Sequence, residues 1–105
     1  MDIKTAAENI GLDEASYRDL LNLFVQSSRE DLERLRAALA ESDSTGVADA
    51  AHSLRGAAGN LDLGEIFHLA GELESRARGG SLENAAQSLE TLKAHLETVA
   101  GAVES

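Results

Sequence analysis

The chain has 105 residues, the size of one small domain, and it contains no cysteine, which excludes disulfides, thiolate metal sites and catalytic thiols. Its formal net charge is -10, from 19 acidic and 9 basic residues, which argues against binding to nucleic acid or to an anionic membrane and favours a protein partner. Hydrophobic residues make up 43% but aromatic residues only 3%, and proline is absent. We therefore expect helices packed on an aliphatic core, with Tyr17, Phe24 and Phe67 as its few large members.

The first residues, up to about position 12, contain no apolar run of signal-peptide or membrane-spanning length, so we expect a cytoplasmic protein. They are predicted to form at most a short extra helix over one end. Because the chain starts with Met1 and stops soon after its last predicted helix, we expect a standalone protein. From residue 13 to about residue 41, apolar side chains recur at spacings of three and four, which predicts one long amphipathic helix with the run REDLER, residues 29–34, on its solvent face.

Three further helices follow. Turn formers at 42–46 (SDSTG) separate the first helix from a second at about 45–61, and DLG at 62–64 predicts a turn into a third at 64–78. The run RGGS at 78–81 predicts a stop, with Ser81 as the N-cap of a fourth helix at 81–103. Four amphipathic helices joined by short turns predict an all-α, antiparallel up-down-up-down four-helix bundle in one domain spanning 1–105.

His52 lies on the solvent side of the second predicted helix. The apolar positions of that helix lie within roughly 60° of one direction on a helical wheel: they are Val47, Ala50, Leu54, Ala57, Ala58 and Leu61. His52 lies roughly 160° from Leu54 on the same wheel. Its imidazole is therefore expected to project into water.

Small residues share the stripe of His52. Gly56 and Gly59 each cost roughly 1 kcal/mol relative to alanine inside a helix, so we interpret them, with Ala48, as clearing the approach of another protein to the ring. Arg55 flanks the stripe and is predicted to meet a charge held on the imidazole. The same sequence is also compatible with an ordinary surface histidine in a helix that tolerates two glycines. Both glycines, however, fall on the stripe of His52 and leave the apolar core stripe intact.

Residues 51–80, AHSLRGAAGNLDLGEIFHLAGELESRARGG, resemble the signature of histidine-containing phosphotransfer (HPt) domains. The matching positions are Ala51, His52, Leu54, Gly56, Ala57, Ala58, Leu73, Glu74 and Gly79. Arg55 stands where lysine is most usual, which keeps the positive charge. Asp62 stands where the family has a turn glycine, and because aspartate tolerates the left-handed conformation we expect the turn to survive.

The resemblance implies a phosphorelay intermediate that takes a phosphoryl group from a receiver-domain aspartate onto His52 and passes it to another receiver, with Arg55 stabilising its charge. It implies no intrinsic cofactor and no ATP-dependent kinase activity, with Mg²⁺ supplied by the partner receiver. The expected partners are response-regulator receivers and a hybrid histidine kinase, bound by a monomer. Gly56, Gly59, Ala48 and Phe67 are the predicted docking residues, although Phe67 could equally be a boundary core residue.

Other interpretations remain open at this stage. The chain could be a receiver-docking adaptor without chemistry, or the phosphoacceptor domain of a chemotaxis-type histidine kinase. Glu65 and His68 have the Glu-x-x-His spacing of di-iron bundles, but a single copy does not make such a site, so we predict no metal. Glu74 and Arg76 are interpreted as a solvated pair of charges with no catalytic role.

Overall fold

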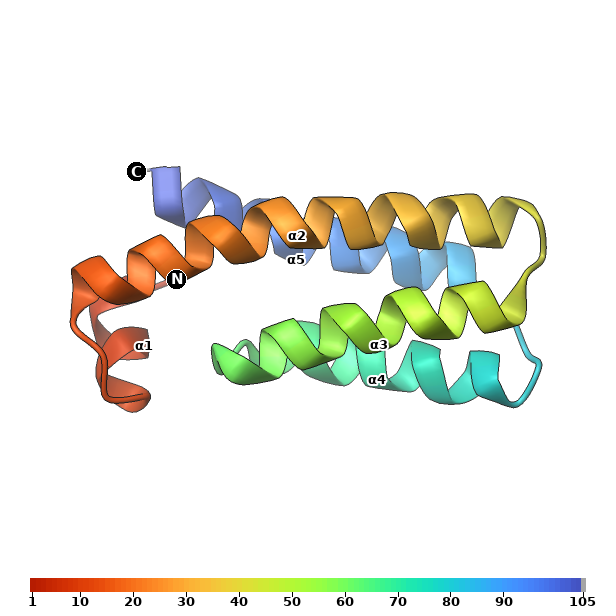
Figure 1. Cartoon of the computed structure of the whole chain (residues 1–105), viewed down its shortest axis with the longest axis horizontal. Coiled ribbons are helices and arrows are strands. Elements are labelled where there is room, and N and C mark those ends of the chain that lie inside the picture. The colour runs from red at the N-terminus through yellow and green to blue at the C-terminus, as the bar shows by residue number, and fades with distance from the viewer. Residues whose placement is uncertain (105) are drawn as a thin grey trace.

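The computed structural model describes residues 1–104, and every regular element in this range is an α-helix (Figure 1). The elements are α1 (Ile3–Asn9), α2 (Glu14–Ala40), α3 (Ser44–Asn60), α4 (Gly64–Arg78) and α5 (Ala85–Glu104). The all-helical fold class is therefore as predicted. No helix within these residues has the length and apolar character needed to span a bilayer.

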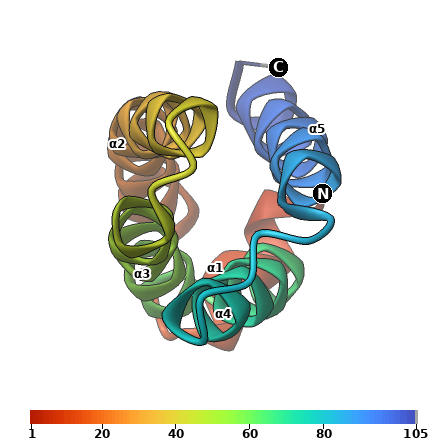
Figure 2. The same cartoon turned by 90° about the vertical axis from the view of Figure 1, so that its right-hand side faces the viewer.

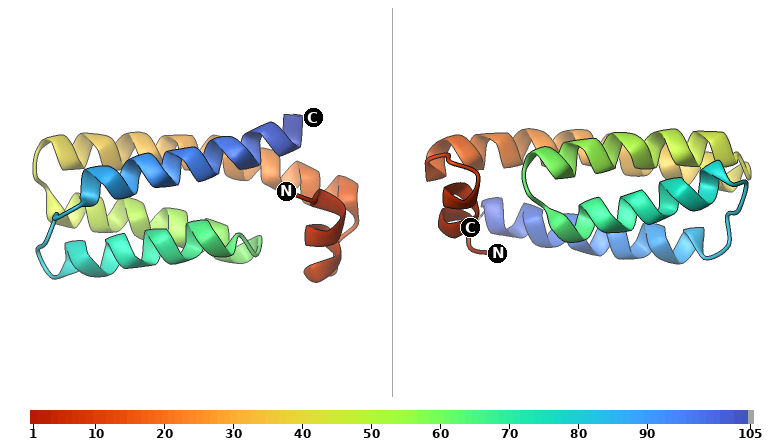
Figure 3. Two further views of the ribbon diagram at one scale, coloured as in Figure 1. Left: turned by 180° about the vertical axis from the view of Figure 1, so that it is seen from behind. Right: turned by 90° about the horizontal axis from the view of Figure 1, so that it is seen from below.

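The four long helices surround a common interior when the molecule is viewed along its long axis (Figure 2). Helix α3 packs against α2 on one side and α4 on the other, and α5 contacts both α2 and α4. The short α1 packs on α2 at one end of the molecule, as both views of Figure 3 show. Because α2 and α4 lie on either side of α3, residues of both helices can contact the side chains of α3.

The core is aliphatic, as the composition predicts, and it includes two of the three aromatic side chains. Tyr17 is fully buried and Phe24 is 3% exposed, whereas Phe67 is 36% exposed and lies at the edge of the bundle. The largest buried aliphatic side chains come from all four long helices: they are Leu21, Leu35, Leu54, Leu73, Leu92 and Leu96. Phe67 is thus not the core residue that composition alone suggested.

Most helix ends follow the sequence signals. Asp13 caps α2, with its Oδ1 accepting from the Ser16 N–H at 2.8 Å, and Asp43 caps α3 through the Gly46 N–H at 3.0 Å. Asp62, in the turn between α3 and α4, has a φ of 58°, so this aspartate does adopt the left-handed conformation. The predicted turn between α3 and α4 is therefore confirmed.

The start of α5 differs from the prediction. The sequence placed it at Ser81, but the helix begins at Ala85. Ser81 forms a local turn in which its Oγ accepts from the Glu83 N–H at 3.3 Å, and Asn84 has a left-handed φ of 62°. Because a left-handed residue interrupts an α-helix, the helix cannot begin before Asn84.

The predicted N-terminal helix is confirmed as α1. Its N-cap is Asp2, whose Oδ1 accepts from the Thr5 N–H at 3.2 Å. Ile3 and Ala7 are buried, so α1 covers apolar surface at its end of the bundle.

One buried hydrogen bond joins α2 to the end of α3. The Tyr17 hydroxyl donates to the carbonyl oxygen of Leu61 at 2.8 Å. Burial, together with the nearby Asp62 carboxylate, raises the pKa of Tyr17 above its ordinary 10.0.

We expect Tyr17→Phe to lower the free energy of unfolding by about 1 kcal/mol, because the Leu61 carbonyl loses its buried partner. The raised pKa favours the protonated phenol in the folded state, so the wild-type protein should lose stability as the pH rises above about 10, and this loss should be smaller in Tyr17→Phe. Urea unfolding of both proteins between pH 7 and pH 11 measures both effects. Equal stabilities at pH 7 would contradict a structural role for the bond.

Candidate functional site

His52 lies on the solvent side of α3, as the helical wheel predicts. Its side chain is 58% exposed, whereas Leu54, two residues later, is 2% exposed. The imidazole is nevertheless held by α4, because its Nδ1 lies 3.0 Å from Oε2 of Glu74. The ring is thus both accessible and oriented.

Glu74 is the site residue that the sequence interpretation missed, and its assignment to a solvated pair with Arg76 was wrong. The Glu74 side chain is only 13% exposed and lies against His52 and Arg55, while Arg76 pairs with Glu72 at 3.9 Å. Oε1 of Glu74 forms an ion pair with Nε of Arg55 at 3.2 Å. One carboxylate therefore joins the two residues that the sequence singled out.

The contacts of Nδ1 of His52 with Glu74 and Arg55 indicate which ring nitrogen carries the proton. A carboxylate only accepts hydrogen bonds and a guanidinium only donates them, so Glu74 and Arg55 make opposite demands on this nitrogen. The terminal guanidinium nitrogen of Arg55 is 3.3 Å from Nδ1, farther than Glu74, and Arg55 is already paired to Glu74 through Nε. We therefore assign the proton to Nδ1, donated to the charged acceptor Glu74. This tautomer leaves the lone pair on Nε2, the other ring nitrogen.

A second arginine reaches the same carboxylate from α4 itself. One guanidinium nitrogen of Arg78 lies 3.6 Å from Oε2 of Glu74, and the other lies 3.1 Å from Oδ1 of Asp49 on α3. A mostly buried carboxylate needs partners to offset its loss of water, and here three cationic or polar side chains provide them. The result is a charge network across α3 and α4 with His52 at its exposed edge.

These contacts follow two facing stripes. On α3 the stripe contains His52, Arg55 and Gly59, and on α4 it contains Phe67, Gly71, Glu74 and Arg78. The later a residue lies on α3, the earlier its partner lies on α4: His52 meets Glu74, Arg55 meets Gly71, and Gly59 meets Phe67. The α3 to α4 hairpin therefore assembles the site from residues that are far apart in the sequence.

Ala48 was predicted to lie on the docking surface, and the structure contradicts this. Its side chain is fully buried. The wheel marked a single face of α3 as core, but the packing of α4 on its flank widens the buried face, so a residue next to the His52 stripe is covered. Ala48 has a packing role only.

Gly56 and Gly59 are both exposed, but they differ in what surrounds them. A Cβ on Gly56 would meet nothing within 4 Å, which fits an open stripe below His52. A Cβ on Gly59 would lie 3.2 Å from the Phe67 ring, so this glycine makes room for an aromatic side chain of α4. The predicted clearing of the approach therefore applies to Gly56, and Gly59 serves close packing.

The residue after His52 is held from the side of α2. Ser53 donates from Oγ to Oδ2 of Asp31 at 3.0 Å, and Arg34 pairs with the other carboxylate oxygen. Asp31 is 4% exposed, so its placement on the solvent face of the first predicted helix was wrong. The sequence carried a signal: Asp31 follows Phe24 by seven residues and precedes Leu35 by four, which puts it on the core side.

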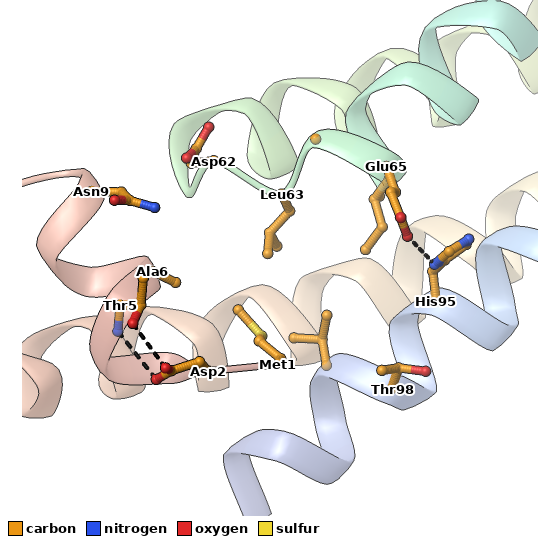
Figure 4. Close-up of a pocket in the computed structure, with 13 residues that line it drawn as sticks. Met1, Asp2, Thr5, Ala6, Asn9, Asp62, Leu63, Glu65, His95 and Thr98 are labelled. Carbon is orange, nitrogen blue, oxygen red and sulfur yellow. Dashed lines mark hydrogen bonds and ion pairs between the residues drawn. The ribbon is translucent and has the colours of Figure 1, made fainter.

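A pocket of about 510 Å³ lies between α1, the start of α4 and α5 (Figure 4). Two of its acidic side chains are paired within the chain: Asp2 caps α1 at Thr5, and Glu65 pairs with Nδ1 of His95 at 3.0 Å. Glu65 thus contacts His95, on another helix. Within residues 1–104, no group of three or more acidic, histidine or cysteine side chains is placed to hold a metal ion.

Comparison with known proteins shows the family to which the chain belongs. The family model for the Hpt domain matches residues 19–102. The chain therefore belongs to the Hpt domain family, whose members are phosphotransfer carriers rather than kinases and interact with receiver domains. It is similar to the histidine-containing phosphotransfer protein B (HptB) of Pseudomonas aeruginosa PAO1, whose crystal structure superposes with a TM-score of 0.79 at 32% sequence identity over 99% of this chain and 90% of that one. No curated protein matches the chain. The family and this likeness support a histidine phosphotransfer carrier role.

The assigned tautomer is directly testable. We expect the ¹⁵N chemical shifts of the neutral His52 ring to report protonated Nδ1 and unprotonated Nε2. Glu74→Gln should keep this pattern, because the amide oxygen also accepts from Nδ1, whereas Glu74→Ala should shift the ring toward a mixture of tautomers. His68, which is exposed, serves as the internal reference in the same spectra. A His52 ring with its proton on Nε2 in the wild-type protein would contradict the assignment.

Proposed function

We propose that the protein is a phosphorelay intermediate that accepts a phosphoryl group on Nε2 of His52 from a receiver-domain aspartate and passes it to the aspartate of another receiver. The observation that carries the proposal is the 3.0 Å contact between Nδ1 of His52 and Glu74 beneath an imidazole that is 58% exposed. This contact leaves a nucleophilic nitrogen facing a partner protein. Glu74 is a positioning residue in this proposal.

The transfer step balances without a separate base. The Nε2 lone pair forms the bond to phosphorus, the bond from phosphorus to the aspartyl oxygen breaks, and its electron pair returns to the carboxylate. The proton stays on Nδ1, so the phosphorylated ring carries a positive charge that faces the Glu74 carboxylate. Neutral imidazole is nucleophilic near pH 7, which is why a histidine can do this without activation by burial. Transfer to the second receiver is the reverse step on a different aspartate.

The rest of the catalytic machinery belongs to the partner. Phosphoryl transfer depends on alignment and on neutralising charge on the transferred oxygens. In our proposal Arg55 supplies one cation beside His52, and the receiver supplies Mg²⁺ and the remaining groups. The carrier itself needs no cofactor. We take α2 to α5 as an antiparallel up-down-up-down bundle that acts as a monomer in the cytoplasm.

The surface beside His52 suits a protein partner. On the α2 side, Leu20 and Leu23 are 39% and 62% exposed and line a groove of about 460 Å³ with Ala57 and Asn60 of α3. Ala57 and Asn60 follow Gly56 on α3 by one and four residues. Exposed apolar side chains in a groove are typical of a docking surface, and we propose that the receiver covers them.

The relay is tested with phosphorylated receivers. Wild-type protein should acquire acid-labile label from at least one receiver of a panel within seconds to minutes, and His52→Gln should acquire none while keeping the wild-type circular dichroism spectrum, because the side chain faces water. His95→Gln, which replaces a histidine of α5 that pairs with Glu65, is the matched control and should transfer normally. Receivers that bind the wild-type protein but never label it would contradict the proposal and favour a docking adaptor.

The docking surface has its own test. Leu23→Asp should raise the receiver concentration that gives half-maximal transfer about ten-fold, about 1.4 kcal/mol, and leave the maximal rate unchanged. Thr91→Asp adds the same charge on the exposed side of α5 and should have no effect. If the two variants behave alike, Leu23 lies outside the interface.

A further inference from the structure

Arg55 lies in a socket formed by Phe67 and Gly71 of α4 and Gly59 of α3. None of these three residues is among the positions that match the phosphotransfer signature. Its Cζ is 6.0 Å from the centre of the Phe67 ring. Its Cδ lies where a Cβ on Gly71 would approach to 3.3 Å. The Phe67 ring in turn lies where a Cβ on Gly59 would approach to 3.2 Å. Gly71 and the Phe67 ring therefore border the path of this arginine across α4, and Gly59 makes room for the ring.

Both glycines lie at close contacts with side chains of the facing helix. Gly59 and Gly71 lie inside α3 and α4, where glycine weakens a helix relative to alanine. A methyl group at either position would be tighter than ordinary van der Waals contact, so the ring or the arginine stem would have to move. The absence of side chains at these two positions lets Phe67 reach α3 and lets Arg55 cross α4.

The socket contacts the guanidinium of Arg55, which is the part of the side chain that lies beside His52. A free arginine side chain loses much rotamer entropy when it is ordered. Here the guanidinium is next to the ring on one side and paired through Nε with Glu74 on the other, at 3.2 Å. Its terminal nitrogen is thereby held 3.3 Å from Nδ1 of His52. The cation is ordered before any phosphoryl group arrives.

We propose that Phe67 is a positioning residue: with Gly59 and Gly71 it holds the Arg55 guanidinium beside His52. The inference rests on the proposed function of His52 as phosphoacceptor. In this proposal, the covered part of the Phe67 ring contacts Arg55 and not the receiver. A docking residue changes the receiver concentration needed for transfer, whereas a positioning residue changes the maximal rate of transfer.

The kinetic experiment uses the full chain and a receiver that labels the wild-type protein. Phe67→Leu should lower the maximal rate about three-fold, the size of a cation–π contact at an exposed site, with an unchanged half-saturating concentration. Phe67→Tyr keeps the ring and should keep the wild-type rate. In an Arg55→Ala background, Phe67→Leu should have no further effect. A change confined to the half-saturating concentration, or additive effects of the two substitutions, would overturn the proposal.

A second readout needs no receiver. In the protein alone, the Nε–H resonance of Arg55 should move in Phe67→Leu, because the ring current is lost, and its ¹⁵N relaxation should show greater motion. An unchanged resonance with unchanged relaxation would overturn the socket. Because this measurement does not involve transfer, it decides the role of Phe67 even if no receiver labels the protein, which would be a failure of the proposed function alone.

Discussion

The Glu74 carboxylate is the group on which the arrangement of the site depends. It is largely withdrawn from water between α3 and α4, and an anion in that position is stable only if donors surround it. The carboxylate has one hydrogen bond, with Nδ1 of His52, and it forms ion pairs with Arg55 and Arg78. The requirement to satisfy one carboxylate thus fixes the imidazole and places two cations near it. An exposed histidine acquires a defined tautomer without losing its access to a partner.

Close packing of α3 on α4 makes this possible. Ala48, Ala51, Ala70 and Ala77 are almost fully buried, and Gly59 and Gly71 lack side chains altogether. Small residues let two helices approach closely, so short contacts from His52 and Arg55 span the interface. On the opposite flank, the hydrogen bond from Ser53 to Asp31 ties α3 to α2. The helix that carries the histidine is therefore held from both sides, while its outer stripe at Gly56 stays open.

The local features of this chain could be predicted from the sequence, and the pairings between helices could not. Apolar periodicity placed the four long helices and the outward direction of His52, and the conformational tolerance of aspartate accounted for the turn at Asp62. Ala48 and Glu74 were misassigned because a helical wheel describes one helix by itself, and both residues lie on flanks that a second helix covers. The early start predicted for α5 failed because Asn84 was treated as an ordinary helical residue, although asparagine, like aspartate, adopts the left-handed conformation more readily than most residues. Folding the α3 to α4 pattern into a hairpin would have placed Glu74 opposite His52.

The charges of the site bear on how long a phosphoryl group would stay there. The chain carries a net charge of -10, so a transferred dianion enters an unfavourable overall field. Exposed charges farther away than about 8 Å are largely screened at physiological salt, and the local groups therefore dominate. Around His52, the charges of Arg55 and Arg78 are balanced by those of Glu74 and Asp49. Because Arg55 and Arg78 are already paired with carboxylates, they would hold a phosphoryl group less tightly than free cations would, which suits a carrier that must pass the group on.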